Sequence, residues 1–109
     1  MRISYTAMES RAHSRNGFPR LKDARAVAIV WARLNHMRLG NFGDCKPVGG
    51  GVEELQIDFG SGYRVYFGRR GALVVILLCG GSKKTQARDI AAAKKYWKEY
   101  LNAQDSGKN

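Results

Sequence analysis

Apolar and polar residues alternate between Val52 and Phe59, a period of two that is typical of a β-strand with one buried face. The apolar set is Leu55, Ile57 and Phe59, and the polar set is Glu54, Gln56 and Asp58. The Gly60–Ser61–Gly62 run that follows predicts a three-residue hairpin loop, because glycine accepts the positive φ that such turns require. The pattern therefore predicts the first half of a β-hairpin.

The second half of the hairpin runs from Tyr63 to Gly68 and alternates in the same way. A symmetric loop would place Phe59 opposite Tyr63 and Asp58 opposite Arg64. Tyr63, Val65 and Phe67 then extend the apolar face, and Arg64 and Tyr66 extend the polar face. The run Ala72–Cys79 is apolar throughout and predicts a further strand that is covered on both faces. Together these runs predict a small antiparallel sheet.

Two longer segments show the spacing of amphipathic helices. The first, Lys22–Leu39, has an apolar stripe that we expect to lie against the sheet, and Gly40 follows as its C-cap. That stripe is Val27, Val30, Trp31, Leu34 and Met37. The second, Gln86–Leu101, has a stripe of Ile90, Ala93, Trp97 and Tyr100 or Leu101. The polar tail Asn102–Asn109 is expected to fray.

The remaining segments are less regular. Gly40–Gly51 is predicted to be a loop whose glycine run lets Lys46 lie over the polar face of the sheet. Residues 1–20 form either an uncertain arm or a short strand, Arg2–Thr6, followed by a short helix, Met8–His13. At 109 residues the chain is predicted to be a single α+β domain, with N-terminal helices and a C-terminal helix packed on the sheet.

Charge narrows the classes of partner. The chain has 19 Lys and Arg against 9 Asp and Glu, so its formal net charge is +10. This bias favours a polyanion: nucleic acid, an anionic membrane surface or an acidic protein. The longest apolar run, Ala72–Cys79, is too short to span a membrane, and the first residues lack a secretory signal. Because Cys45 and Cys79 do not form a disulfide framework, we expect a soluble protein of the reducing cytoplasm.

The residue types present exclude several chemistries. Two isolated histidines and two cysteines do not have the spacing of a metal site, and no Ser/His/Asp or Cys/His arrangement is plausible. Gly80–Thr85 lacks the spacing of a phosphate-binding GxxxxGK[ST] loop, so no cofactor is expected. The start of the helix that follows, beside Lys83 and Lys84, still offers free backbone N–H groups to an anion.

Three cations are predicted to gather near the polar face of the sheet: Lys46, Arg64 and Lys83, with Tyr66 beside Arg64. Such a patch suits a phosphodiester, and cations can stabilise the transition state when a ribose 2′-OH attacks its own 3′ phosphate. The alternative for Arg64 is an exposed ion pair with Asp58, which is worth only ~0.2–1 kcal/mol. The alternative for both lysines is a solvated surface position.

Three strings, in the right order, resemble the motifs of one protein family: GNFGDCKPVGGGVEELQIDFGSGYRVYF, LLCGGSKKTQ and DIAAAKKYW. Between Leu21 and Tyr100 the chain resembles the RelE/ParE superfamily of toxins from type II toxin–antitoxin modules, and within it the HigB-like "addiction module killer" subgroup. This resemblance implies a RelE-like compact fold. It also implies a metal-independent endoribonuclease, an mRNA interferase, that cuts mRNA on the ribosome.

The resemblance also implies roles for individual residues. Arg64 takes the place of a catalytic or phosphate-holding arginine, with Lys46 and Lys83 as supporting cations. The general base has no clear counterpart, so Tyr66, Asp89 and Lys46 all remain candidates. Further contacts to nucleic acid are expected from Lys84, Arg69, Arg70 and Arg88. The Gly80–Gln86 junction is more basic than in relatives, which usually have Asp at the position of Ser82.

The implied partners follow from the same family. They are the ribosome with its mRNA and a cognate antitoxin of the helix-turn-helix HigA type. The toxin would contact operator DNA only through that antitoxin. No membrane partner is expected. One alternative function is that of a ParE-like toxin, which inhibits DNA gyrase by binding without catalysis. A second alternative is a protein of the toxin fold that has lost its activity, which only the irregular N-terminus indicates. The set of cations on the polar face favours the nuclease, because a gyrase inhibitor does not require it.

Overall fold

The protein forms one five-stranded sheet with a helix on each face. The computed structural model describes residues 2–4, 24–60, 62–80 and 83–106. Its elements are β1 (Arg2–Ser4), α2 (Ala24–Arg38), β2 (Cys45–Gly49), β3 (Val52–Ile57), β4 (Tyr63–Arg70), β5 (Leu73–Gly80), the short 3₁₀ turn η1 (Lys83–Thr85) and α3 (Gln86–Ser106). The predicted α+β class is confirmed.

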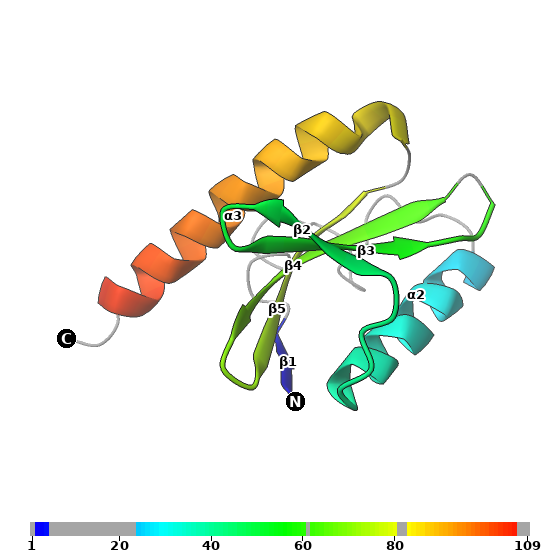
Figure 1. Ribbon diagram of the computed structural model, residues 1–109, viewed down its shortest axis with the longest axis horizontal. Helices are drawn as coiled ribbons and strands as arrows, with labels where there is room; N and C mark the ends of the chain where they lie inside the picture. The colour runs from blue at the N-terminus through cyan, green and yellow to red at the C-terminus, as the bar shows by residue number, and fades with distance from the viewer. Residues whose placement is uncertain (1, 5–23, 61, 81–82, 107–109) are drawn as a thin grey trace.

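The strands lie in the order β1-β5-β4-β3-β2 (Figure 1). Strands β2 to β5 are antiparallel to their neighbours, as predicted, whereas β1 runs parallel to β5, with Arg2 opposite Leu73. The expectation of a purely antiparallel sheet is therefore wrong at this edge. The short N-terminal strand is confirmed over Arg2–Ser4, and the helix predicted at Met8–His13 lies outside the described residues.

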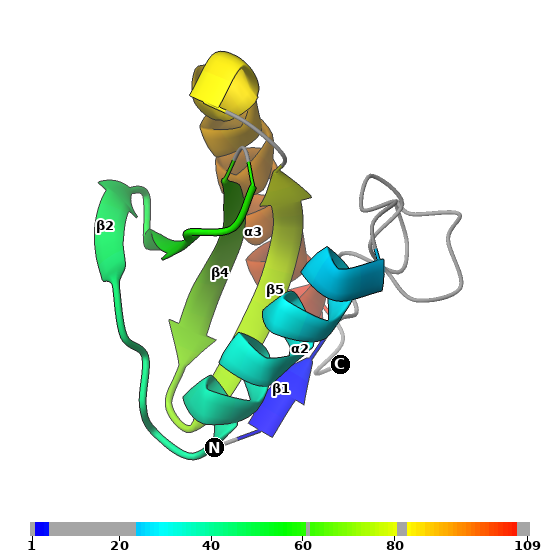
Figure 2. The ribbon, with the colours of Figure 1, turned by 90° about the vertical axis from the view of Figure 1, so that its right-hand side faces the viewer.

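Helix α2 covers one face of the sheet (Figure 2). Its buried residues Val30, Leu34 and Met37 pack with Leu55, Ile57, Val65, Phe67, Val74, Ile76 and Cys79. Trp31, which was predicted to belong to this stripe, is 37% exposed. The helix ends as predicted: Asn41 N–H donates to His36 O and Gly40 N–H to Met37 O, and Gly40 has a φ of 92°. These two bonds form a Schellman C-cap.

Helix α3 covers the opposite face, so the face predicted to be polar is itself half apolar. Ala93 and Trp97 are buried against a group formed by Val52, Tyr66, Val75 and Leu77. Trp97 lies so close to Gly68 that a Cβ there would come within 2.6 Å of the indole ring. The helix continues to Ser106. The end predicted at Leu101 is therefore wrong, and so is the predicted fraying of the tail up to Ser106.

The β3–β4 hairpin differs from the predicted register by two residues. Ile57 lies opposite Tyr63, Gln56 opposite Arg64 and Glu54 opposite Tyr66. Because the shift is even, every side chain keeps its predicted face, but its cross-strand partner changes. The two strands are joined by residues 58–62 rather than by a three-residue loop, and the predicted pairing of Asp58 with Arg64 is wrong.

The predicted loop before β3 also contains a strand. Cys45–Gly49 pairs with β3, and Lys46 lies opposite Glu54. Pro47 fits there because β2 is the edge strand of the sheet, where a missing N–H costs little. Lys46 is thus placed by strand pairing rather than by loop flexibility. Among the described residues, no helix has both the length and the apolar character needed to cross a membrane.

Candidate functional site

A buried carboxylate, that of Glu54, lies at the centre of the face where β2, β3, β4 and the start of α3 meet. Its side chain has no exposed surface. Gln86 Nε2, from the first residue of α3, donates a hydrogen bond of 2.9 Å to Glu54 Oε2, and Gln56 Nε2 donates one of 3.4 Å to Oε1. Two cations flank the same carboxylate. A buried charge is stable only with such partners.

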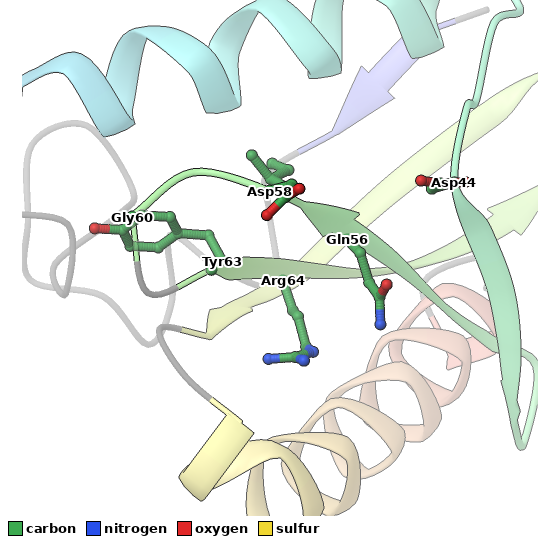
Figure 3. Close-up of a pocket in the computed structure, with 8 residues that line it drawn as sticks. Asp44, Gln56, Asp58, Gly60, Tyr63 and Arg64 are labelled. Carbon is green, nitrogen blue, oxygen red and sulfur yellow. The ribbon is translucent and has the colours of Figure 1, made fainter.

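Arg64 is one of these cations. Its Nε lies 3.8 Å from Glu54 Oε2, and its side chain is 15% exposed. That distance exceeds the 2.7–3.2 Å of a hydrogen bond, so the attraction is coulombic, and the buried Nε–H has no acceptor among the described residues. In Figure 3 the guanidinium extends from β4 toward the start of α3. Because Nε is itself buried, only the exposed part of the Arg64 side chain can meet a ligand.

Lys46 is the second cation. Its Nζ lies 3.8 Å from Glu54 Oε1, the other oxygen of the carboxylate. Its side chain is 59% exposed, so the ammonium group is held toward the site from one side and reaches solvent on the other. The structure thus brings Lys46 and Arg64 together, as predicted from the sequence, and does so through a residue that the sequence analysis had not singled out.

Tyr66 lies beneath this cluster. Its side chain is fully buried, and its hydroxyl makes no hydrogen bond of good geometry in the described part of the chain. Burial raises the pKa of Tyr66 well above its ordinary value, and the nearby Glu54 carboxylate raises it further. The phenol therefore stays protonated at neutral pH and does not reach the surface, where a substrate would meet it.

Asp89, the second candidate for a general base, is also buried, with 2% of its surface exposed. Thr85 Oγ1 donates a 2.7 Å hydrogen bond to Asp89 Oδ2. The carboxylate lies so close to β5 that a Cβ on Gly80 would come within 2.5 Å of Oδ2. Gly80 is opposite Arg64 in the β4–β5 pairing, so Asp89 fixes the start of α3 next to the site.

The exposed cations Lys83, Lys84 and Arg88 lie on η1 and the first turn of α3. The hydrogen bond from Gln86 to Glu54 ties this segment to the same carboxylate that Lys46 and Arg64 flank. This bond places the start of α3 beside the site, and the association of the three cations with the site stays a prediction.

Arg69 and Arg70 do not join the cluster. Both lie at the other end of β4, about 17 Å (Arg69) and about 20 Å (Arg70) along the strand from Arg64 at ~3.3 Å per residue. Arg69 also points to the opposite face, where its Nε and Nη2 donate to the Glu53 carboxylate at 2.7 and 3.0 Å and its guanidinium stacks 3.8 Å from the centre of the Phe42 ring. Its charge is already neutralised by a bidentate partner.

A pocket of about 400 Å³ opens beside Arg64, at the end of the β3–β4 hairpin (Figure 3). Asp44, Gln56, Asp58, Tyr63 and Arg64 contribute side chains to its lining. The two carboxylates disfavour a phosphate inside the pocket. An anion that approaches Arg64 is therefore better placed on the side of Lys46 and the start of α3.

Glu54 is the functional residue that sequence reasoning missed. Alternation placed it on the polar face, but could not show that α3 would cover that part of the face. The signal was present in the alternation itself: Glu54 shares a face with Arg64 and Tyr66 on neighbouring strands. Cys79 is buried at the end of β5 and is not part of a disulfide. Among the described residues, no three His, Cys, Asp or Glu side chains gather as a metal site.

The arrangement can hold an anion. The Lys46 and Arg64 charges together equal those of the Glu54 and Asp89 carboxylates, so the net positive charge that attracts an anion comes from the exposed cations of η1 and α3. Cations fixed in place by a rigid sheet need little reorganisation when negative charge develops on a bound group.

A comparison with known proteins gives one informative relative. An uncharacterized protein of Haemophilus influenzae (strain ATCC 51907 / DSM 11121 / KW20 / Rd) is 52% identical over 75 residues, which are 69% of this chain and 76% of the relative. No protein-family model matches the chain, and no solved structure matches it significantly.

Proposed function

The chain belongs to the same protein family as the Haemophilus influenzae relative, and we propose that it is the toxin of a type II toxin–antitoxin module with a RelE-like, HigB-like fold. Its activity is the ribosome-dependent cleavage of mRNA. The observation that carries this proposal is the convergence of Lys46, Arg64 and the start of α3 on the Glu54 carboxylate.

In the proposed reaction the ribose 2′-oxygen attacks the adjacent phosphorus and the bond from phosphorus to the 5′-oxygen breaks. The leaving 5′-oxygen takes up a proton from water, so the products are a 2′,3′-cyclic phosphate and a free 5′-hydroxyl, and no metal takes part. Arg64 and Lys46 neutralise the charge that builds up on the phosphate oxygens. Lys83 at η1 adds a third positive charge to the same side.

A general base must take the proton of the 2′-hydroxyl. Lys46 is exposed, whereas Asp89 and Tyr66 are buried. This exposure favours Lys46 as the base: its neutral amine form takes the 2′-hydroxyl proton, and the ammonium group that results carries the positive charge beside the phosphate oxygens. Asp89 and Tyr66 then have supporting roles without contact to the substrate. Asp89 holds the start of α3, and Tyr66 fills the space beneath the site.

The proposed setting is the bacterial cytoplasm. The net charge of +10 suits binding to ribosomal RNA and mRNA, and a helix-turn-helix antitoxin of the HigA type would neutralise the toxin. Operator DNA would be bound through that antitoxin.

The test uses purified protein, ribosomes and a translated mRNA, with primer extension to map breaks. Cleavage within codons that requires ribosomes supports the proposal. Intact mRNA together with loss of DNA supercoiling by purified gyrase would instead identify a ParE-like inhibitor.

A further inference from the structure

We propose that Glu54 is a positioning residue of this site: its buried carboxylate fixes Lys46 and Arg64 beside the scissile phosphate and competes with that phosphate for both cations. The inference rests on the proposed function and names a residue that acts without touching the substrate.

The geometry assigns each oxygen of Glu54 its own partners. Oε1 faces Lys46 Nζ from β2, and Oε2 faces Arg64 Nε from β4, both at 3.8 Å. The neutral amides of Gln56 and Gln86 donate to one oxygen each. Because one cation lies beside each oxygen, the carboxylate draws both cations to the same part of the sheet.

Stability alone does not explain a charge at this position. The apolar cluster on this face of the sheet includes Val52 and Leu77, and an apolar residue in place of a buried ion pair is often neutral or stabilising. Glu54 is fully buried, so taking its carboxylate out of water carries a large desolvation cost. The positioning of two cations on one side of the sheet explains why a charge with this desolvation cost is present.

The distances leave both cations able to bind a ligand. Neither cation has a hydrogen bond to Glu54, since 3.8 Å is beyond hydrogen-bond range. An incoming phosphate oxygen at about 2.8 Å would be a stronger partner than the carboxylate. Glu54 thus holds the cations in position but does not saturate their donors.

This double role gives the variant Glu54→Gln an unusual signature. The amide removes the competing charge, so we expect about three- to tenfold tighter binding of RNA. It also releases Lys46 and Arg64 from their fixed positions, so we expect the cleavage rate to fall by about 100-fold, the scale of losing one preorganised donor. Partial unfolding would instead weaken binding and cleavage together.

The experiment measures both quantities. Binding is measured with a short RNA whose 2′-hydroxyls are methylated, so that it cannot be cleaved, and single-turnover cleavage is measured on ribosomes. Glu53→Gln is the matched control: it is the same substitution one residue away, it also breaks an arginine pair, and it lies on the opposite face. We expect Glu53→Gln to leave both quantities within twofold of the wild type.

A spectroscopic measurement separates this inference from the proposed function. In ¹⁵N spectra of arginine side chains, the buried Arg64 Nε–H should give a slowly exchanging signal that Glu54→Gln abolishes and Glu53→Gln preserves. If the wild-type protein does not cleave mRNA, the proposed function fails, and the Nε–H signal and binding of the methylated RNA still decide the role of Glu54.

An unchanged Nε–H signal in Glu54→Gln, or equal losses of binding and cleavage, would overturn the inference. Should Glu54→Gln fail to fold, Glu54→Asp serves in its place, because it keeps the charge but withdraws the carboxylate by one methylene. Slower cleavage with an unchanged dissociation constant then supports positioning, and an unchanged rate contradicts it.

Discussion

Arg64 on β4 and Glu54 on β3 form an ion pair across neighbouring strands, with 3.8 Å between Nε and Oε2, and the carboxylate is fully buried. The pair links the stability of the sheet to the proposed chemistry, because the same guanidinium serves both. A buried carboxylate that loses a partner is costly, whereas an exposed pair is worth little.

Arg64→Ala is therefore expected to lose cleavage and also stability. We expect a loss of about 3 kcal/mol in the free energy of unfolding, near the lower limit for breaking a buried pair because Lys46 and Gln86 still contact the carboxylate. Urea unfolding measures this. Lys95→Ala, on the exposed surface of α3, is the control and should change stability by less than ~0.5 kcal/mol.

Arg64→Lys tests the geometry of the group rather than its charge. Lysine keeps the positive charge beside Glu54, so the protein should unfold within about 1 kcal/mol of the wild type, but it lacks the planar fork of donors. We expect cleavage to fall at least ~10-fold. Full activity in Arg64→Lys would show that the site needs only a positive charge.

Lys46→Ala separates chemistry from stability. Because its side chain is 59% exposed, its ion pair is screened by solvent, and we expect a change in unfolding free energy below ~1 kcal/mol. Single-turnover cleavage should nevertheless fall by about 100-fold if this amine faces the 2′-hydroxyl. Lys98→Ala, exposed on α3 and remote from the site, should match the wild type in both assays.

The faces of the strands and the two helix stripes could be predicted from the sequence, because both depend on local periodicity. The hairpin register could not, because loop length sets it: residues 58–62 form a longer connection than the glycines suggested. The faces survived this error since the shift is even, but Arg64 was given the wrong partner, Asp58.

Periodicity also could not predict how the two helices and the sheet are layered. Periodicity shows that a stripe is buried, but not which face of the sheet it covers, so the burial of Glu54 beneath α3 was missed. The sequence of β2 predicts a loop, because Pro47 and three glycines are typical of loops, yet the segment is an edge strand. The position of Arg64 followed from its correctly predicted face, whereas Lys46 reaches the site through strand pairing that the sequence analysis did not predict.

Gly68→Ala tests the packing of α3. The new methyl group would overlap the Trp97 ring, so Trp97 must move, and overpacking of this kind costs typically ~1–3 kcal/mol. Thermal unfolding should show the loss. Gly68→Ala combined with Trp97→Leu should lose less than the sum of the two single variants, because the smaller side chain makes room. Additive losses would mean that the contact is not tight.

Cys45 gives a pH-dependent prediction. Burial, and to a smaller extent the Glu53 carboxylate, raises the pKa of the Cys45 thiol from 9.0 to about 11. The thiol should therefore react with iodoacetamide at pH 8 about 10- to 100-fold more slowly than a free thiol. The raised pKa favours the folded state below pH ~9, and this contribution is lost as the pH rises toward 11. The variant Cys45→Ser shows which part of the alkylation belongs to Cys45. Rapid alkylation of Cys45 at pH 8 would contradict the prediction.

Cleavage of mRNA on ribosomes, compared between wild type and Arg64→Lys, is the most direct test of the central claim. Primer extension should show breaks within codons for the wild type, and a loss of these breaks in the folded Arg64→Lys protein. Mass spectrometry of the upstream fragments should show 2′,3′-cyclic phosphate ends. Breaks of equal strength from both proteins, or none from the wild type, would contradict the account.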